Sequence, residues 1–301
     1  MKRLVVVLGS FLATLALTVP SGCAGATDRT KFSFEARAGG AATGLSQADF
    51  TFTNERNWTI TLRKANVTLG PVYLNTVAPL VDSPTGFLGH FVRSAHADGG
   101  DHLGGGRIVG EVLSQITFNA LSSELAPFPL LGTTTDEPVR TTDVWLYPAP
   151  GVSADTTKID TVTLDVAGVA RRGDQELRFR GALILNDAWL PDATAGQRGT
   201  TSIALLRRVR GIPSAFTPEN GGSLELRFDV RAPFRGADFS NLETSPSDRD
   251  GVKLLVQSKS GKNTTDQIMT NLFQGVRATT GTYSVRWASP ATGNQFSTNH
   301  P

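Results

Sequence analysis

Cysteine is almost absent from this chain of 301 residues, which contains only one, and there are only four histidines and two methionines. A single cysteine excludes a disulfide framework and any zinc or iron–sulfur cluster built on several thiolates. Neither sign of charge dominates, because 29 Lys and Arg stand against 27 Asp and Glu. The hydrophobic fraction of 39% is too high for a disordered chain. The chain is therefore expected to fold as one large domain or two modest ones.

One long uncharged run is present, and it lies at the N-terminus. Lys2 and Arg3 precede residues 4–19, which carry no charge. This run is short for a membrane-spanning helix, which needs about 20 apolar residues. A short basic segment followed by such a run is typical of a secretory signal peptide. The run leads into Val-Pro-Ser-Gly-Cys, which ends at the only cysteine, Cys23.

Small residues directly before a lone cysteine resemble the lipobox of bacterial lipoproteins, although Pro20 stands where that family usually has an aliphatic residue. The resemblance implies that residues 1–22 are a signal peptide that is removed, and that Cys23 is diacylated on sulfur and becomes the new N-terminus. Residues 23–30 would then be an acylated tether that holds the domain close to the lipid bilayer. Ala24 resembles the residue found in lipoproteins of the outer membrane. The alternative is ordinary secretion with an unmodified thiol.

The mature chain would be electrically balanced. Without Lys2 and Arg3, 27 basic residues stand against 27 acidic ones, and no basic run follows. Nucleic acid is therefore not expected as a partner, because its binding needs many cations that neutralise phosphates. The lipobox resemblance covers residues 1–23 only and places the protein in the bacterial cell envelope. No functional family is recognised for the mature chain.

Hydrophobic and polar residues alternate through most of the mature chain, which is the period of a β-strand. Leu224, Leu226 and Phe228 show this alternation clearly, with charged residues between them. Other alternating segments are residues 31–38, 50–52, 58–63, 67–74, 144–147, 159–170, 176–185, 203–209 and 281–287.

The residues between and around these segments predict further local structure. Gly70 and Pro71 predict a bulge or an edge, and residues 172–175 predict a hairpin loop. Residues 264–273 have apolar positions at helical spacing and predict a short helix, whereas residues 111–124 fit a helix or a strand equally. Many strands without long crossover helices predict an all-β fold, an antiparallel β-sandwich with Greek-key-like connections. Residues 31–301 would form one such domain, or two apposed halves, with at most one short helix near 264–274.

Three of the four histidines, His90, His96 and His102, fall within thirteen residues of a Gly-rich stretch. Imidazole is a common ligand of zinc and copper, and a carboxylate can complete such a site. The predicted metal ligands therefore comprise the three histidines together with Asp98, Asp101 or Glu111. Spacings of six residues match no known metal motif, so a solvated polar loop is the alternative.

Tryptophan is the other candidate for binding chemistry. Trp58, Trp145 and Trp287 are in phase with the alternating core positions and are expected to be buried. Trp189 lies in a segment rich in turn residues, and it is the ring most suited to stack on a sugar.

These features favour a binding protein over an enzyme. The first hypothesis is a lipid-anchored protein of the bacterial cell envelope, assigned to the outer membrane, that binds a divalent transition metal such as Zn or Cu through residues 90–111. The second is a structural or interaction lipoprotein that binds a protein or glycan partner without metal. The third is a metal-dependent hydrolase that uses Glu111 as base, which no recognised hydrolase motif supports.

Overall fold

The computed structural model describes residues 30–41, 49–77, 107–146, 162–185, 189, 206–240, 242, 248–255 and 264–290. Within them, strands dominate, and the all-β prediction is confirmed. The strands are β1 (Lys31–Gly40), β2 (Phe50–Thr53), β3 (Thr59–Asn75), β4 (Ile108–Val112), β5 (Ile116–Asn119), β6 (Ala126–Pro127), β7 (Gly132–Thr135), β8 (Val139–Leu146), β9 (Val162–Arg172), β10 (Gln175–Ile184), β11 (Arg208–Phe216), β12 (Ser223–Phe228), β13 (Val252–Leu255) and β14 (Tyr283–Ala288). The helices are a single 3-10 turn, η4 (Ala232–Phe234), and the α-helix α3 (Thr264–Arg277).

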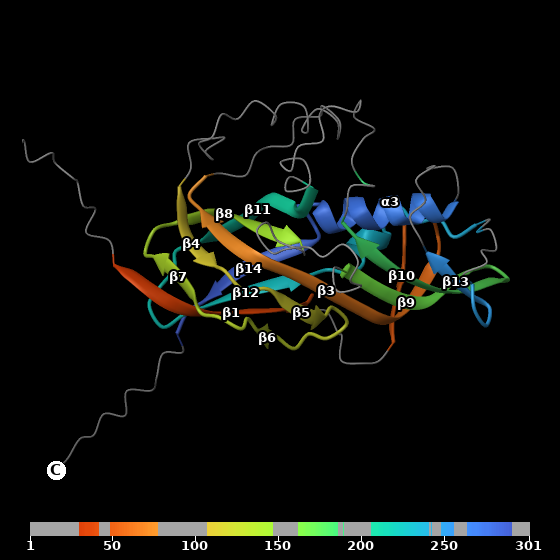
Figure 1. The fold of residues 1–301 in the computed structure, drawn as a ribbon, viewed down its shortest axis with the longest axis horizontal. Helices are drawn as coiled ribbons and strands as arrows, with labels where there is room; N and C mark the ends of the chain where they lie inside the picture. The colour runs from red at the N-terminus through yellow and green to blue at the C-terminus, as the bar shows by residue number, and fades with distance from the viewer. Residues whose placement is uncertain are drawn as a thin grey trace, which may run out of the picture.

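The described strands are hydrogen bonded into one curled 14-stranded sheet (Figure 1). The main path runs β13-β10-β9-β3-β4-β7-β1-β12-β14. This differs from the predicted antiparallel sandwich, which is not confirmed, because the pairing links all strands and two pairs are parallel, β1 with β12 and β10 with β13. Side-chain alternation has the same period in parallel and antiparallel strands, so it does not reveal strand direction.

The long strand β3 is the centre of the sheet. Its partner on one side changes from β5 to β4 at Gly70 and Pro71, and the register with β8 shifts between Leu69 and Val72. Gly70 has φ of 115°, and a Cβ atom there would lie 2.3 Å from the carbonyl oxygen of Ser114. Glycine is therefore required where β3 changes partner, and the predicted bulge is confirmed.

Local predictions elsewhere also hold. Arg172 pairs with Gln175 across a two-residue turn in which Gly173 has positive φ, as the predicted hairpin requires. The ambiguous residues 111–124 contribute to β4 and β5 and do not form a helix. The predicted helix is α3, which ends three residues beyond 274. Among the described residues, no helix combines the length and apolar character that a membrane crossing requires.

The core lies inside the curl of the sheet and under α3. Four aromatic residues meet there, with Trp58 and Phe179 against Phe239, and Phe179 also against Phe234. The inner face of α3 is apolar and at most 3% exposed, and consists of Ile268, Met269, Leu272, Phe273 and Val276. Burial of this face holds α3 against η4 and leaves its other face polar.

Candidate functional site

Most of the predicted metal ligands, and the predicted lipidation site, lie outside the described part of the chain. These are Cys23, His90, His96, Asp98, Asp101 and His102. Glu111 is described, and it lies on β4, opposite Tyr73 of β3 and Thr133 of β7. Within the described residues, no group of three or more His, Cys, Asp or Glu side chains is placed to hold a metal ion.

The residues that flank the histidine-containing segment are hydrogen bonded to each other. The backbone N–H of Thr76 donates to the Arg107 carbonyl at 3.1 Å, and the Arg107 N–H donates to Thr76 Oγ1 at 3.2 Å. These bonds continue the pairing of β3 with β4. The chain therefore leaves the sheet at residue 77 and re-enters it at residue 107, at one point beside β4.

A pocket of about 400 Å³ lies beside this point and contains Glu111. We call it the β4–β7 pocket; its lining is Lys31, Arg107, Ile108, Val109, Gly110, Glu111, Thr133, Thr135 and Glu137. Arg107 forms an ion pair with Glu137, whose Oε1 also accepts a hydrogen bond from Thr135. Glu111 makes no side-chain hydrogen bond or ion pair with any described residue. Its carboxylate is thus available to a ligand.

A second pocket, also of about 400 Å³, lies between α3, the turn after β2 and the segment after η4. We call it the α3 pocket; it is lined by Arg56, Gly236, Asp238, Gln267, Thr270, Asn271 and Gln274. All of its side chains are polar. One cation and one anion, Arg56 and Asp238, cancel in charge, and the rest are uncharged amides and a hydroxyl.

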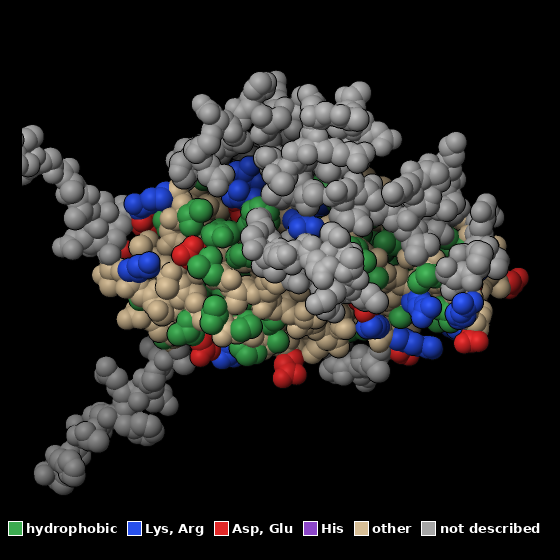
Figure 2. All heavy atoms as spheres, in the orientation of Figure 1, with side chains coloured by type: hydrophobic (Ala, Val, Ile, Leu, Met, Phe, Trp, Pro, Cys, Tyr) green, Lys and Arg blue, Asp and Glu red, His purple; other side chains and the backbone are tan. Residues whose placement is uncertain are grey.

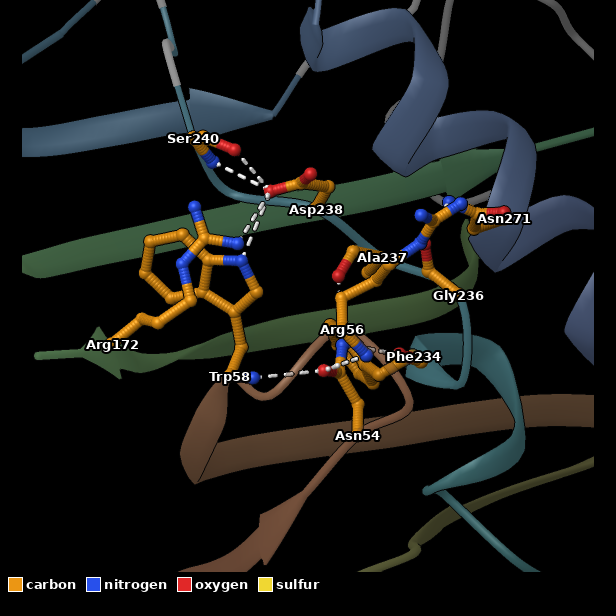
Figure 3. Close-up of polar contacts among 10 residues, drawn as sticks. All are labelled: Asn54, Arg56, Trp58, Arg172, Phe234, Gly236, Ala237, Asp238, Ser240 and Asn271. Atoms are coloured by element: carbon orange, nitrogen blue, oxygen red, sulfur yellow. Dashed lines mark hydrogen bonds and ion pairs between the residues drawn. The ribbon is translucent and has the colours of Figure 1, made fainter.

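Asp238 is held through one carboxylate oxygen (Figure 3). Oδ1 accepts hydrogen bonds from Trp58 Nε1 at 3.0 Å, from the Ser240 N–H at 2.9 Å and from the Ser240 hydroxyl. Arg172 stacks over the Trp58 ring, 4.5 Å from its centroid, and its Nη1 lies 3.6 Å from Oδ1. No described residue bonds to Oδ2. Partial burial acts to raise the pKa of Asp238, but the hydrogen bonds from Ser240 and Trp58 and the charge of Arg172 bring it below its ordinary value.

Asn54 fixes the other wall of the α3 pocket. Its side-chain amide donates to the carbonyls of Phe234 at 3.0 Å and Ala237 at 2.7 Å. Its Oδ1 accepts from the backbone N–H groups of Arg56 and Trp58, both at 3.0 Å. This buried residue therefore ties the turn that carries Arg56 to the segment that carries Asp238 (Figure 3).

The tryptophans are placed by their packing. Trp58 is 1% exposed, which confirms that it belongs to the core. Trp189 stacks on Phe273, with ring centroids 4.4 Å apart and planes within 12°, and donates to the Ile184 carbonyl at 2.8 Å. One face of its ring is therefore packed against the protein itself and the residue is only partly buried, so the expectation that it stacks on a sugar stays a prediction.

Three of the four exposed large hydrophobic residues of the described part lie close together, and the fourth is Ile108 at the start of β4. Leu113, Leu130 and Leu131, which we call the leucine cluster, are 58%, 58% and 63% exposed. Continuing the register of Glu111 with Thr133 sets Leu113 beside Leu131, and the Leu130 N–H donates to Ser114 Oγ. Figure 2 shows hydrophobic side chains exposed over the end of the sheet that contains β4 and β7. Large exposed apolar patches are typical of interaction sites, so the leucine cluster is a candidate contact surface.

The α3 pocket and the leucine cluster were not predicted from the sequence. Arg56, Asp238 and Asn271 are far apart in the chain. The sequence shows only that the predicted helix has a polar face, and it does not show which residues that face meets. No protein-family model, no curated protein and no solved structure matches this chain.

Proposed function

We propose that this protein is a lipid-anchored protein of the bacterial envelope that binds a divalent transition-metal ion. His90, His96 and His102 would supply imidazole ligands, and Asp98, Asp101 or Glu111 would supply the carboxylate that completes the site, of which Glu111 is the one described. The observation that carries the proposal is the placement of Glu111. Its carboxylate lacks a described partner, and it faces a pocket beside the hydrogen-bonded residues, Thr76 and Arg107, that flank the histidine segment. The proposed role is binding and not catalysis.

The leucine cluster supports the anchor at Cys23. Strand β7 pairs with β1, and Gly132, next to Leu131, lies opposite Phe34. Thr30, just before β1, is seven residues from Cys23 in sequence, which corresponds to a reach of at most about 25 Å. An acyl chain on Cys23 would therefore keep β1 and the leucine cluster close to the bilayer. We propose that the cluster contacts the outer-membrane lipid surface. Burial of the leucine side chains at the lipid boundary would remove the unfavourable free energy of their exposure to water.

Metal titration tests the proposal directly. The purified protein is stripped with a chelator and titrated with ZnCl₂ and CuCl₂ by calorimetry, and we expect saturable binding that weakens below about pH 6.5 as imidazole is protonated. The double variant His96→Ala, His102→Ala is expected to lose this binding, whereas His300→Ala serves as the matched control and retains it. Unchanged affinity in the double variant would rule out the proposed ligands.

The anchor has its own test. Incorporation of labelled palmitate should depend on Cys23 and disappear in Cys23→Ser. A protein that takes up no label would be secreted without an acyl anchor.

A second candidate function is an envelope lipoprotein that binds a glycan partner without metal. The α3 pocket favours it, because every side chain that lines it is polar and the two charges cancel.

A further inference from the structure

The α3 pocket presents hydrogen-bonding groups that the protein does not use itself. Oδ2 of Asp238 is an acceptor without a described partner, while Oδ1 is immobilised by Trp58 and Ser240. The guanidinium of Arg56 makes no side-chain hydrogen bond or ion pair with a described residue, and it extends toward Asn271 (Figure 3). The pocket thus offers one charged acceptor and one charged donor.

The helix supplies a third wall. Gln267, Thr270, Asn271 and Gln274 are spaced so that they share one face of α3, opposite the buried apolar face. Asn271 Nδ2 donates to the Gly236 carbonyl at 3.1 Å, which fixes the amide and leaves its Oδ1 as a second acceptor. The amides of Gln267 and Gln274 and the hydroxyl of Thr270 can each both donate and accept a hydrogen bond.

We propose that the α3 pocket binds a neutral saccharide. A sugar hydroxyl can donate to Asp238 Oδ2 and a neighbouring hydroxyl can accept from Arg56, and amides suit the remaining hydroxyls. The cancelling charges of the lining favour an uncharged ligand over an anion or a cation. A volume of about 400 Å³ is within the range of small-molecule sites and suits one or two sugar rings.

Affinity is expected to be modest, because no aromatic residue is among the described residues that line the α3 pocket. Trp58 is 1% exposed and is covered by Arg172. Binding then depends on hydrogen bonds that replace those made to water, and we expect a Kd of about 1 mM. This inference deepens the second candidate function and does not depend on the metal proposal.

The test uses the full acylated protein in detergent micelles, titrated with cellobiose, maltose and N,N′-diacetylchitobiose by calorimetry and ligand-detected NMR. Glycine, which is a zwitterion, and sodium sulfate, which supplies a dianion, are the comparators that carry formal charges. We expect at least one disaccharide to saturate the protein, and the two charged solutes to show no binding. The proposal is overturned if none of the disaccharides binds at roughly ten times the expected Kd, or if glycine or sulfate binds in their place.

Two variants assign the binding to the pocket. Arg56→Ala is expected to weaken saccharide binding at least tenfold, whereas Arg140→Ala, which removes an exposed arginine from β8, leaves it unchanged. Gly236→Ala removes no polar group, but its Cβ would lie 3.4 Å from Asn271 Oδ1 and would narrow the pocket. Binding that is equal in both pocket variants and the wild type would place the sugar elsewhere.

Chelation separates this inference from the metal proposal. Saccharide binding that persists after chelation supports the α3 pocket even if no metal binds to the protein. Saccharide binding that is lost with the metal would assign the sugar to the metal site and overturn the inference.

Discussion

Arg208 and Asp143 form a buried ion pair between β11 and β8. Arg208 Nε and Nη2 both donate to Asp143 Oδ2, at 3.1 and 2.7 Å, and the two side chains are 13% and 6% exposed. The backbone N–H of Gly211 donates to the other carboxylate oxygen at 2.8 Å. Both oxygens of Asp143 are therefore satisfied within the sheet.

Breaking this pair should destabilise the fold strongly. Asp143→Ala removes the carboxylate that accepts two hydrogen bonds from the buried Arg208 side chain and one from the Gly211 N–H, and we expect the free energy of unfolding to fall by about 3–5 kcal/mol. Chemical denaturation measures the change. Glu176→Ala is the matched control, because its pair with Arg171 is exposed and contributes less than about 1 kcal/mol. Equal effects in the two variants would contradict this assignment.

Asp238 should make stability depend on pH in the acid range. Its folded-state pKa lies below the ordinary value of 3.8, so its contribution is complete above that value and is lost as pH falls through the folded-state pKa. Denaturation at several pH values should show the difference in stability between the wild type and Asp238→Asn shrinking as pH decreases below about 4. A difference that does not vary with pH would mean that the carboxylate contributes nothing through its charge.

Glu111 should contribute to metal affinity. Glu111→Gln keeps the size of the side chain but removes its charge, so we expect Zn²⁺ or Cu²⁺ to bind at least tenfold more weakly, equivalent to about 1.4 kcal/mol. Calorimetry compares it with Glu219→Gln, which changes an exposed carboxylate elsewhere. If both variants bind like the wild type, Glu111 is not a ligand.

The leucine cluster should be protected from solvent at a membrane. In vesicles of phosphatidylethanolamine and phosphatidylglycerol, amide hydrogen exchange of the acylated protein should slow at Leu130 and Leu131 and stay unchanged near Gln175. The double variant Leu113→Ser, Leu131→Ser should lose this protection and remain attached through its acyl chain. Failure to attach at all would count against the anchor, and attachment without protection would count against the surface.

Trp189 should matter for stability and not for ligand binding. Trp189→Ala removes the stack on Phe273 and a hydrogen bond to Ile184, so we expect a loss of about 3 kcal/mol. Thermal unfolding measures this loss. Saccharide affinity should be unchanged at temperatures where the variant is folded, and a selective loss of affinity would return Trp189 to the binding site.

The sequence indicated the candidate metal ligands by composition alone and missed the α3 pocket. Clustered histidines are visible in any sequence, whereas Arg56 and Asp238 become neighbours only because Asn54 joins their two segments. Asp143 illustrates the same limit. Nothing in its position among threonines marks it as buried, and the structure buries it against Arg208.

By itself the sequence determined where most strands and the one long helix of the described part form, because alternation, helical spacing and turn residues act over a few neighbouring positions. Leu224, Leu226 and Phe228 are buried, as their alternation predicted. Only the tertiary structure decided which strands pair and in which direction. The parallel pair of β1 with β12 joins segments almost 190 residues apart (Glu35↔Ser223). Such contacts depend on packing across the whole sheet, and no local pattern encodes them.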